Sequence, residues 1–503
     1  MHRIAPWAIL GAFLLYLGVA AFAPDRTPDG FRIGEFASLP VVMNGRVQPI
    51  DSIARAGLHR IRGASTEASG GAPAWQFWNA PRRLEGSEWL LELLTKPDAA
   101  DARRIFQIHE PTLIAALHLK PAGDGSIYYT YADLRPGLEM LGQQAVRIKA
   151  MDAAKRAPWE AECLALRNTI VVYDRFKNSL QPNSALQNEA RGKPLGYDFS
   201  AEIAQYQRDL HADFAAVRAV KDGKPQDRDS AREQRMDAFA RPFLVVSRAA
   251  MFSIVPRGGQ VRERDRWQNM GDSVAASMRS GQVSQAAAMF ASMSSAFARG
   301  NASAFNEQVA KYQQWLMQRR MTPELSNARY ELFFNTFQPF AKTLTIYLVA
   351  VLLLCASRMS GLRVLSKTAC NLIALAWLLH TAGLVLVMTL ERRLPVTNGY
   401  GRILVIGWVA VLVTGAAGMK WRNALGATAA ALAGLLTLAV AQSLTPGGAP
   451  EWIRLAQQNG LWLAAAATAL LAAAGLITVS RRSRSTDHAV PLRVPEPAVG
   501  SVA

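Results

Sequence analysis

The chain has 503 residues, half of them hydrophobic, and a formal net charge of +18. The apolar residues concentrate in the first two dozen positions and after Pro339, which excludes an entirely soluble protein and indicates a membrane protein. The excess of basic over acidic residues lies mostly in the apolar part of the chain, in short segments beside its apolar runs, without an accompanying aromatic cluster or recognition motif, so nucleic acid is excluded as a partner.

Residues 1–23 are predicted to be an N-terminal membrane anchor or signal segment. Arg3 precedes an apolar run that begins at Trp7, and Ala21 and Ala23 resemble a signal-peptidase site. Proline at position 24 suits cleavage poorly, which favours an uncleaved anchor whose N-terminus is cytoplasmic. Residues 24–338 would then lie outside the cytoplasm.

Residues 24–338 are predicted to form a mostly helical extracytoplasmic domain. Near its start, the short apolar run 39–43 suits an extended segment, and Asn44-Gly45 is a strong signal for a tight turn. The apolar positions that follow fit a helix that begins at Asp51, which we expect to cap it. We also expect a helix over 86–97, and a strand that leads into another helix over 126–141.

Two later helices carry apolar residues at helical spacing, so a helical hairpin is predicted, with Gly300 ending its first helix. Such a stripe could bind a partner, but it is more typical of a domain core. The two stripes consist of Ala286, Phe290, Met293, Phe297, Phe305, Val309, Tyr312 and Leu316.

Residues 339–480 are predicted to be a five-helix membrane domain, followed by a disordered cytoplasmic tail over 481–503. The five apolar segments are 344–357, 369–390, 403–419, 424–444 and 461–479. With the anchor they make about six crossings. The fold class expected is therefore mainly α, a polytopic helical membrane protein with a large extracytoplasmic domain.

The charges between these segments predict the orientation. Arg358, Arg363 and Lys367 fall in one connection, Lys420 and Arg422 in another, and further arginines follow the last segment. Positive residues favour the cytoplasmic side. We therefore expect an inner-membrane protein, in contact with membrane lipid, with its large domain in the periplasm and its C-terminus in the cytoplasm. The polar loop 391–402 would lie on the outer side.

His380 is an ionisable residue near the middle of a predicted crossing. A side chain of this kind in a membrane is costly unless it is paired or functional, which makes His380 a candidate ligand for haem or a metal. The alternative is a neutral imidazole bonded to a neighbouring helix. The chain has no nucleotide-binding loop, haem-attachment motif or hydrolase triad, and its outer histidines are dispersed. No catalytic residue and no metal site is assigned.

Four passages resemble the CcsA/ResC-like cytochrome c biogenesis proteins. The segment 39–55 is similar to that family's opening motif, and 126–134 to its aromatic-rich segment. The segments 328–354 and 378–408 are similar to its first membrane helix and its first helical hairpin. The matching positions are Asn44, Gly45, Arg46, Pro49, Asp51 and Arg55, then Glu331, Asn335, Phe340 and Tyr347, and finally His380, Pro395, Thr397, Asn398, Tyr400 and Trp408.

The resemblance implies a component of the system that delivers haem across the membrane and attaches it to apocytochrome c. The family's tryptophan-rich haem segment, W-G-x-x-W-x-W-D, does not occur in these 503 residues. Haem-lyase activity is therefore not transferred to this chain. We expect a non-catalytic subunit that binds a separate haem-handling membrane protein and apocytochrome c.

Two alternatives remain open at this stage. The chain could bind haem directly through His380 and act in transport, or it could be an outer sensory or scaffold domain on a membrane anchor. In the first alternative haem is the cofactor. Otherwise no cofactor is expected.

Overall fold

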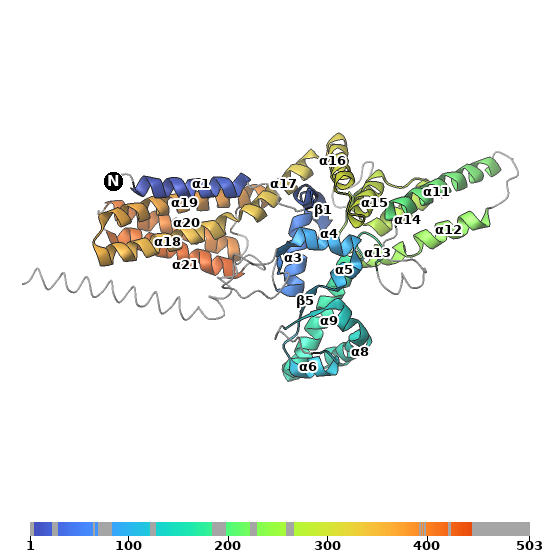
Figure 1. Cartoon of the computed structure of the whole chain (residues 1–503), viewed down its shortest axis with the longest axis horizontal. Helices are drawn as coiled ribbons and strands as arrows, with labels where there is room; N and C mark the ends of the chain where they lie inside the picture. The colour runs from blue at the N-terminus through green and yellow to red at the C-terminus, as the bar shows by residue number, and fades with distance from the viewer. Residues whose placement is uncertain are drawn as a thin grey trace, which may run out of the picture. The chain divides into compact units, whose positions relative to one another are not determined.

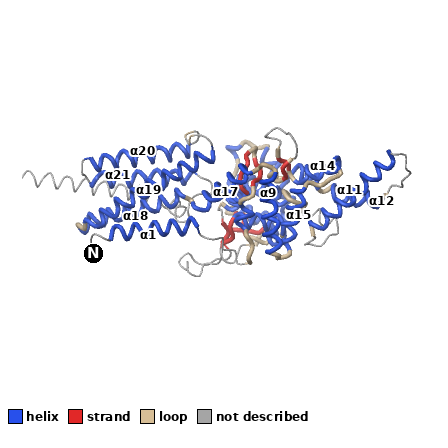
Figure 2. The backbone as a smooth tube through the Cα atoms, turned by 90° about the horizontal axis from the view of Figure 1, so that it is seen from above, coloured by secondary structure: helices blue, strands red, loops and turns tan. Residues whose placement is uncertain are grey.

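The structure is a computed structural model. It describes residues 5–22, 29–63, 66–68, 83–120, 127–183, 198–221, 229–257, 266–391, 394, 396, 399–420 and 424–444. The described chain is mainly helical, as the sequence predicts, and its described strands are short (Figures 1 and 2). The expected crossing at 461–479 and the tail at 481–503 lie outside the described residues.

The part of the chain between residues 29 and 337 contains most of the elements. Its helices are α2 (Ile33–Ala37), α3 (Ile50–Arg62), α4 (Gly86–Thr95), α5 (Pro97–Asp101), α6 (Pro111–Ala116), α7 (Tyr131–Leu134), α8 (Leu138–Lys149), α9 (Pro158–Lys177), α11 (Phe199–Lys221), α12 (Ser230–Ala240), α13 (Phe243–Ala249), α14 (Met270–Ser280), α15 (Gln285–Ala298), α16 (Ala302–Gln318) and α17 (Thr322–Phe337). Two 3-10 turns are η2 (Arg135–Gly137) and η3 (Ala153–Lys155).

The described strands pair only as antiparallel two-stranded ribbons. The pairs are β1 (Pro40–Met43) with β2 (Arg46–Pro49), β3 (Thr66–Ala68) with β4 (Arg83–Glu85), β5 (Arg104–Gln107) with β6 (Tyr128–Thr130), and β7 (Val255–Pro256) with β8 (Trp267–Gln268). Ribbons of this size cannot bury a core alone, so they are held by the helices around them.

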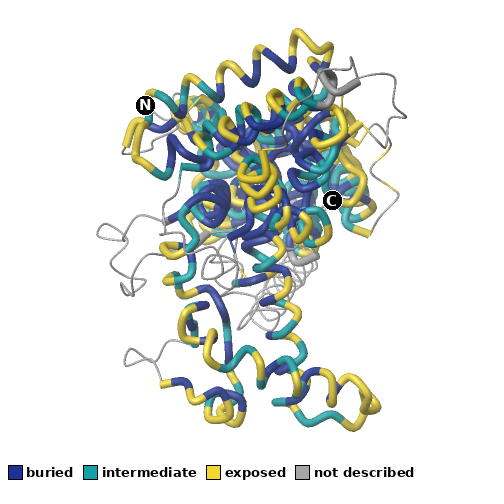
Figure 3. The backbone as a smooth tube through the Cα atoms, turned by 90° about the vertical axis from the view of Figure 1, so that its right-hand side faces the viewer, coloured by how far each residue is buried: buried dark blue, intermediate teal, exposed yellow. Residues whose placement is uncertain are grey.

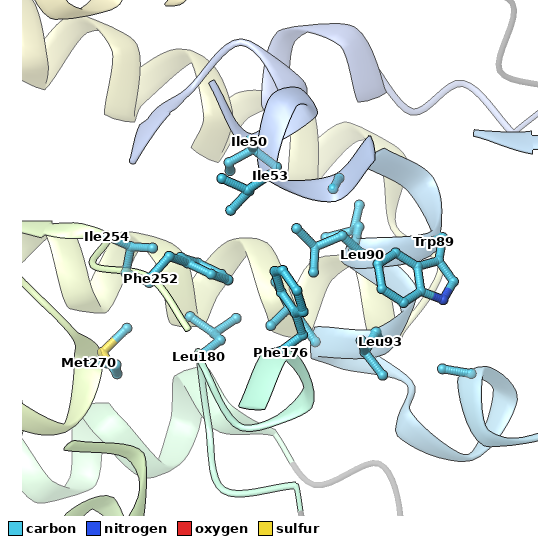
Figure 4. Close-up of a cluster of buried hydrophobic side chains, with 14 of the residues drawn as sticks. Ile50, Ile53, Trp89, Leu90, Leu93, Phe176, Leu180, Phe252, Ile254 and Met270 are labelled. Carbon is cyan, nitrogen blue, oxygen red and sulfur yellow. The ribbon is translucent and has the colours of Figure 1, made fainter. Parts of the chain in front are cut away.

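The core of this region forms where the apolar faces of α3, α4 and α9 meet, together with residues near β7 (Figure 4). On α3 the buried positions Ile50, Ile53 and Leu58 follow helical spacing, and on α4 the indole of Trp89 packs edge-on against the ring of Phe176, with centroids 6.2 Å apart. Buried and exposed residues alternate along the helices, as amphipathic packing requires (Figure 3). The helices therefore share one hydrophobic core.

The predicted hairpin of two amphipathic helices is confirmed as α15 and α16, which pack against each other. The eight stripe residues are all buried within the core, and Gly300 follows α15 with a positive φ of 73°. The stripe is thus part of the domain interior rather than an exposed binding surface.

After α17 the chain forms a bundle of apolar helices. They are α18 (Pro339–Ser360), α19 (Arg363–Glu391), α20 (Gly399–Lys420) and α21 (Ala424–Leu444), which lie beside one another with α1 (Ala5–Phe22) (Figures 1 and 2). Four candidate spans are long and apolar enough to cross a membrane, and α1 is a shorter apolar helix. Side chains such as Leu352, Leu378 and Ile406 are more than half exposed, as residues facing lipid would be.

The first candidate span covers Thr322–Ser360, but the backbone breaks inside it. Gln338 adopts a left-handed conformation with a φ of 49°, and Pro339 begins the next helix. The 22 residues of α18 rise by about 33 Å at 1.5 Å per residue, which is enough for a bilayer core without α17.

Candidate functional site

The turn at Asn44-Gly45 places Arg46 at the start of β2. Both turn residues have positive φ, 54° and 75°, and Met43 pairs with Arg46 across them. This conformation is the two-residue hairpin turn that asparagine and glycine favour, so the sequence prediction is confirmed. Pro49 ends β2, pairs with Pro40, and directly precedes α3.

Arg46 contacts a residue 285 positions further along the chain. Its Nη2 donates a hydrogen bond of 2.6 Å to Oε2 of Glu331 on α17, and Ser52 Oγ donates one of 2.6 Å to Oε1 of the same carboxylate. Glu331 is 8% exposed. Both of its oxygens therefore have partners from the first sixty residues of the chain.

Asn335 lies one turn after Glu331 on α17 and continues the network. Its Nδ2 donates to Oδ2 of Asp51 at 3.0 Å and to Oγ of Ser52 at 2.9 Å. Residues four apart share one face of a helix, so Glu331 and Asn335 both reach α3. We name these contacts, with those of Asp51 described next, the polar junction.

Asp51 is at the centre of the polar junction and is 1% exposed. Its carboxylate accepts hydrogen bonds from Arg55 Nε at 2.8 and 2.9 Å, from Ser87 Oγ at 2.8 Å and from Asn335. The expectation that Asp51 caps α3 is wrong. The helix begins one residue earlier, its N-cap is Pro49, and the Asp51 side chain bonds to other side chains rather than to helix N–H groups.

Arg55 supplies the charge that balances Asp51. Burial alone would lower the pKa of its guanidinium, but the carboxylates of Asp51 and Glu85 raise the pKa above its ordinary value. The guanidinium stays charged at every physiological pH, so the buried Asp51 is neutralised by a permanent cation.

A close approach between helices brings Ser87 to this site. A Cβ on Gly86, the first residue of α4, would lie 3.0 Å from the backbone N of Arg55 and 3.1 Å from the carbonyl C of Ala54. Only glycine allows the start of α4 to lie so close to α3. Ser87 follows it and reaches Asp51.

The polar junction is suited to fixing α17 against β2 and α3, and not to catalysis. Each carboxylate oxygen of Asp51 and Glu331 accepts at least one hydrogen bond, and the junction presents no unpaired nucleophile. Fully satisfied buried networks of this type make an arrangement unique and rigid. The rigid arrangement here joins β2 and α3 to the helix that precedes the bundle.

His380 lies on α19 in a second cluster. It is 0% exposed, and the ring of Phe340 packs edge-on against it, with centroids 5.7 Å apart and planes at 83°. The ring of Tyr400 on α20 also packs edge-on against the phenyl ring of Phe340, with centroids 6.4 Å apart. Three matching positions of the bundle therefore meet at one point.

Neither ring nitrogen of His380 makes a hydrogen bond within the part of the chain that the structure describes. The backbone of Leu404 on α20 is near the imidazole but does not meet hydrogen-bond geometry. The donor atom that a haem iron requires is thus present. However, pockets for ligands of this size typically enclose about 300–1,000 Å³, and this ring is completely covered. A haem does not fit beside His380 in this arrangement.

The remaining positions named from the sequence are separate from these two clusters. Trp408 stacks on Trp377 at 5.5 Å, and its Nε1 donates to Thr381 Oγ1 at 2.8 Å. Tyr347 is buried against Gly434 of α21. Pro395, Thr397 and Asn398 lie outside the described residues. Among those described, no group of three or more His, Cys, Asp or Glu side chains could hold a metal ion.

The aromatic-rich segment contributes to a third cluster, between α7 and α9. Tyr131 stacks on Tyr173 at 5.0 Å and donates to Asp174 Oδ1 at 2.9 Å. Lys177 is 3% exposed, lies 4.8 Å from the Tyr131 ring centroid, and donates to Asp101 Oδ2 at 2.6 Å. Burial raises the pKa of the Asp174 carboxyl, against the lowering effect of the Tyr131 hydrogen bond and the Lys177 charge.

Sequence reasoning missed Ser52 and Ser87 as members of the polar junction. Ser52 adjoins a matching position, but nothing in the local pattern separates it from other helix serines. Ser87 becomes part of the site only through the helix crossing at Gly86.

In comparisons with known proteins, no family model and no curated protein matches the chain.

Proposed function

We propose that this chain is a non-catalytic subunit of a membrane complex for cytochrome c maturation. In this role its apolar helices bind a separate haem-handling membrane protein, and its outer domain guides apocytochrome c. The proposed location is the inner membrane, with the outer domain in the periplasm and the C-terminus in the cytoplasm.

The observation that carries this proposal is the polar junction. Five of the positions at which two separate passages resemble the same family, Arg46, Asp51, Arg55, Glu331 and Asn335, are joined by Ser52 into one set of contacts. Residues from unrelated chance matches would have no reason to meet. Their meeting supports the interpretation that both passages belong to one inherited arrangement.

A second observation supports the subunit role. A fully satisfied junction that joins an outer domain to apolar helices would hold the domain at a set position above a membrane partner. The haem-attachment chemistry would then belong to that partner, because these 503 residues contain no tryptophan-rich haem segment.

The test is a deletion strain combined with purification of the full chain in mild detergent. We expect loss of covalently bound haem from c-type cytochromes in the deletion strain, and recovery of a haem-containing membrane protein with the purified chain. Normal c-type cytochromes in the deletion strain, together with no such protein in the preparation, would overturn the proposal.

Direct haem binding by this chain is the competing proposal. The unbonded ring nitrogens of His380 favour it, and the complete enclosure of the ring opposes it. An absorption spectrum of the isolated chain and of His380→Ala separates the two. A Soret band that the substitution removes would establish the competing proposal.

A further inference from the structure

A pocket of about 660 Å³ lies between the N-terminal parts of α1 and α19. Its lining includes the indole of Trp7 from α1 and, from α19, the polar side chains of Arg363, Ser366, Lys367 and Asn371. This pocket is separate from the polar junction and from the His380 cluster. Its residues enter the proposed function only through the charges of Arg363 and Lys367, which predict the orientation in the membrane.

The pocket is positively charged. Arg363 and Lys367 lie one turn apart on α19, both are exposed, and no acidic side chain of the described residues pairs with either. The first turn of α19 holds no acidic residue, so its free N–H groups add to the positive potential. Ser366 and Asn371 supply uncharged hydrogen-bond donors. These groups together suit a phosphate rather than a cation or an apolar ligand.

The pocket lies at the end of the bundle that is remote from the polar junction. Helix α18 runs from Pro339, next to α17, to Ser360, and the chain then turns at Gly361 into α19. The length of α18, about 33 Å, therefore separates the pocket from Gln338, as a bilayer separates its two headgroup layers.

Exposed apolar side chains surround this end. Trp7 is 67% exposed, Met359 is 90% exposed and Leu362 is 53% exposed. Tryptophan is favoured at headgroup depth, and exposed apolar residues beside a basic pocket suit acyl chains better than water. The exposed apolar residues around the pocket therefore favour a phospholipid over a soluble phosphate ester.

We propose that this pocket binds a phosphate group, that of an anionic phospholipid such as phosphatidylglycerol. The phosphate contacts Arg363 and Lys367 and the N–H groups at the start of α19, and Trp7 packs against the glycerol and upper acyl region. The lipid thereby joins α1 to α19.

The experiment uses the full chain in detergent and measures bound dioleoyl phosphatidylglycerol by native mass spectrometry. Lys367→Gln and Arg363→Gln are each expected to lower the affinity about fivefold, because each removes one direct contact between a cationic side chain and the phosphate in the pocket. Arg358→Gln is the matched control, since Arg358 is exposed at the same end, on the last turn of α18, but does not line the pocket. It should leave the affinity unchanged. Equal losses from Arg358→Gln and Lys367→Gln would overturn the proposal.

A second arm identifies the source of the phosphate and does not depend on the charge variants. Cys370 is exposed and lines the pocket, so its alkylation by N-ethylmaleimide reports occupancy. Phosphatidylglycerol should slow this alkylation, whereas phosphatidylcholine and millimolar glycerol phosphate should not. If only glycerol phosphate protects the Cys370 thiol, the ligand of the pocket is a soluble phosphate ester rather than a lipid. If neither phosphatidylglycerol nor glycerol phosphate protects it, the pocket does not bind phosphate.

Discussion

Asn335 Nδ2 lies 3.0 Å from Oδ2 of Asp51, although the two residues are 284 positions apart in the chain. This contact joins α3, near the start of the described chain, to α17, which directly precedes the apolar bundle.

Removing the Asp51 carboxylate should strongly lower the stability of the region that packs around α3 and α17. Asp51→Ala leaves the buried guanidinium of Arg55 without its main counter-charge, leaves Ser87 without this acceptor, and removes one of the two acceptors of Asn335. Breaking a buried ion pair from one side costs about 3–5 kcal/mol. Thermal unfolding in detergent should show a markedly lower transition. Glu307→Gln, which breaks an exposed ion pair with Lys311, should leave the transition nearly unchanged.

The contact between Arg46 and Glu331 should appear as an interaction energy in a double-mutant cycle. Arg46→Gln and Glu331→Gln each remove the charge attraction, so the double variant should be less destabilised than the sum of the singles. Coupled residues of this kind differ from additivity by about 0.5–3 kcal/mol. Additive effects on denaturant stability would show that the pair makes no net contribution.

Adding one methyl group where α3 and α4 cross, at Gly86, should lower the stability of the protein. Gly86→Ala places a Cβ 3.0 Å from a backbone atom of Arg55, and overpacking of this kind costs about 1–3 kcal/mol. Gly142→Ala is the matched control, because nothing lies within 4 Å of a Cβ there and alanine favours the helix by about 0.5–1 kcal/mol. The two alanine variants should therefore shift the unfolding temperature in opposite directions.

The enclosed imidazole of His380 should be replaceable by an apolar side chain of similar size. His380→Leu removes two unbonded polar nitrogens, so the unfolding temperature in detergent should stay the same or rise. His380→Ala should lower it, because it leaves a cavity. An equal loss from both variants would mean that the ring nitrogens make a stabilising bond.

Asp174 should make stability depend on pH. Burial raises the pKa of this carboxyl in the folded state, so the folded chain binds its proton more tightly than the unfolded chain does. The stabilisation that this tighter proton binding gives is fully present below the pKa that Asp174 has in the unfolded chain. It is lost as the pH rises through the higher pKa that Asp174 has in the folded chain. Asp174→Asn cannot ionise, so its unfolding temperature relative to the natural protein should be higher at pH 7 than at pH 4. The same difference at both values would contradict the raised pKa.

Local patterns predicted much of the fold because their causes are local. The Asn44-Gly45 turn follows from the two residues that tolerate positive φ, and the α15–α16 hairpin follows from apolar spacing that can be read over one helix at a time. Four of the apolar segments also became helices near their expected bounds.

The candidate site was less predictable because its contacts are not local. In the sequence, an aspartate that caps a helix cannot be distinguished from one that accepts a hydrogen bond from a distant asparagine. Asp51 accepts such a bond from Asn335 and does not cap α3. The covering of His380 by Phe340 likewise depends on how separate helices pack. The family resemblance selected several of these positions but gave no reason for their proximity.

The polar junction also determines what a break in the chain would do. A cut between α9 and α11 would give two fragments, one with α1, β2 and α3, and the other with α17 and the four longer apolar helices. Each fragment would hold part of the same buried network; the first would keep α1 and the second the four longer apolar helices. Reassembly of the two polypeptides would require the contact between Asp51 and Asn335 to form between two molecules.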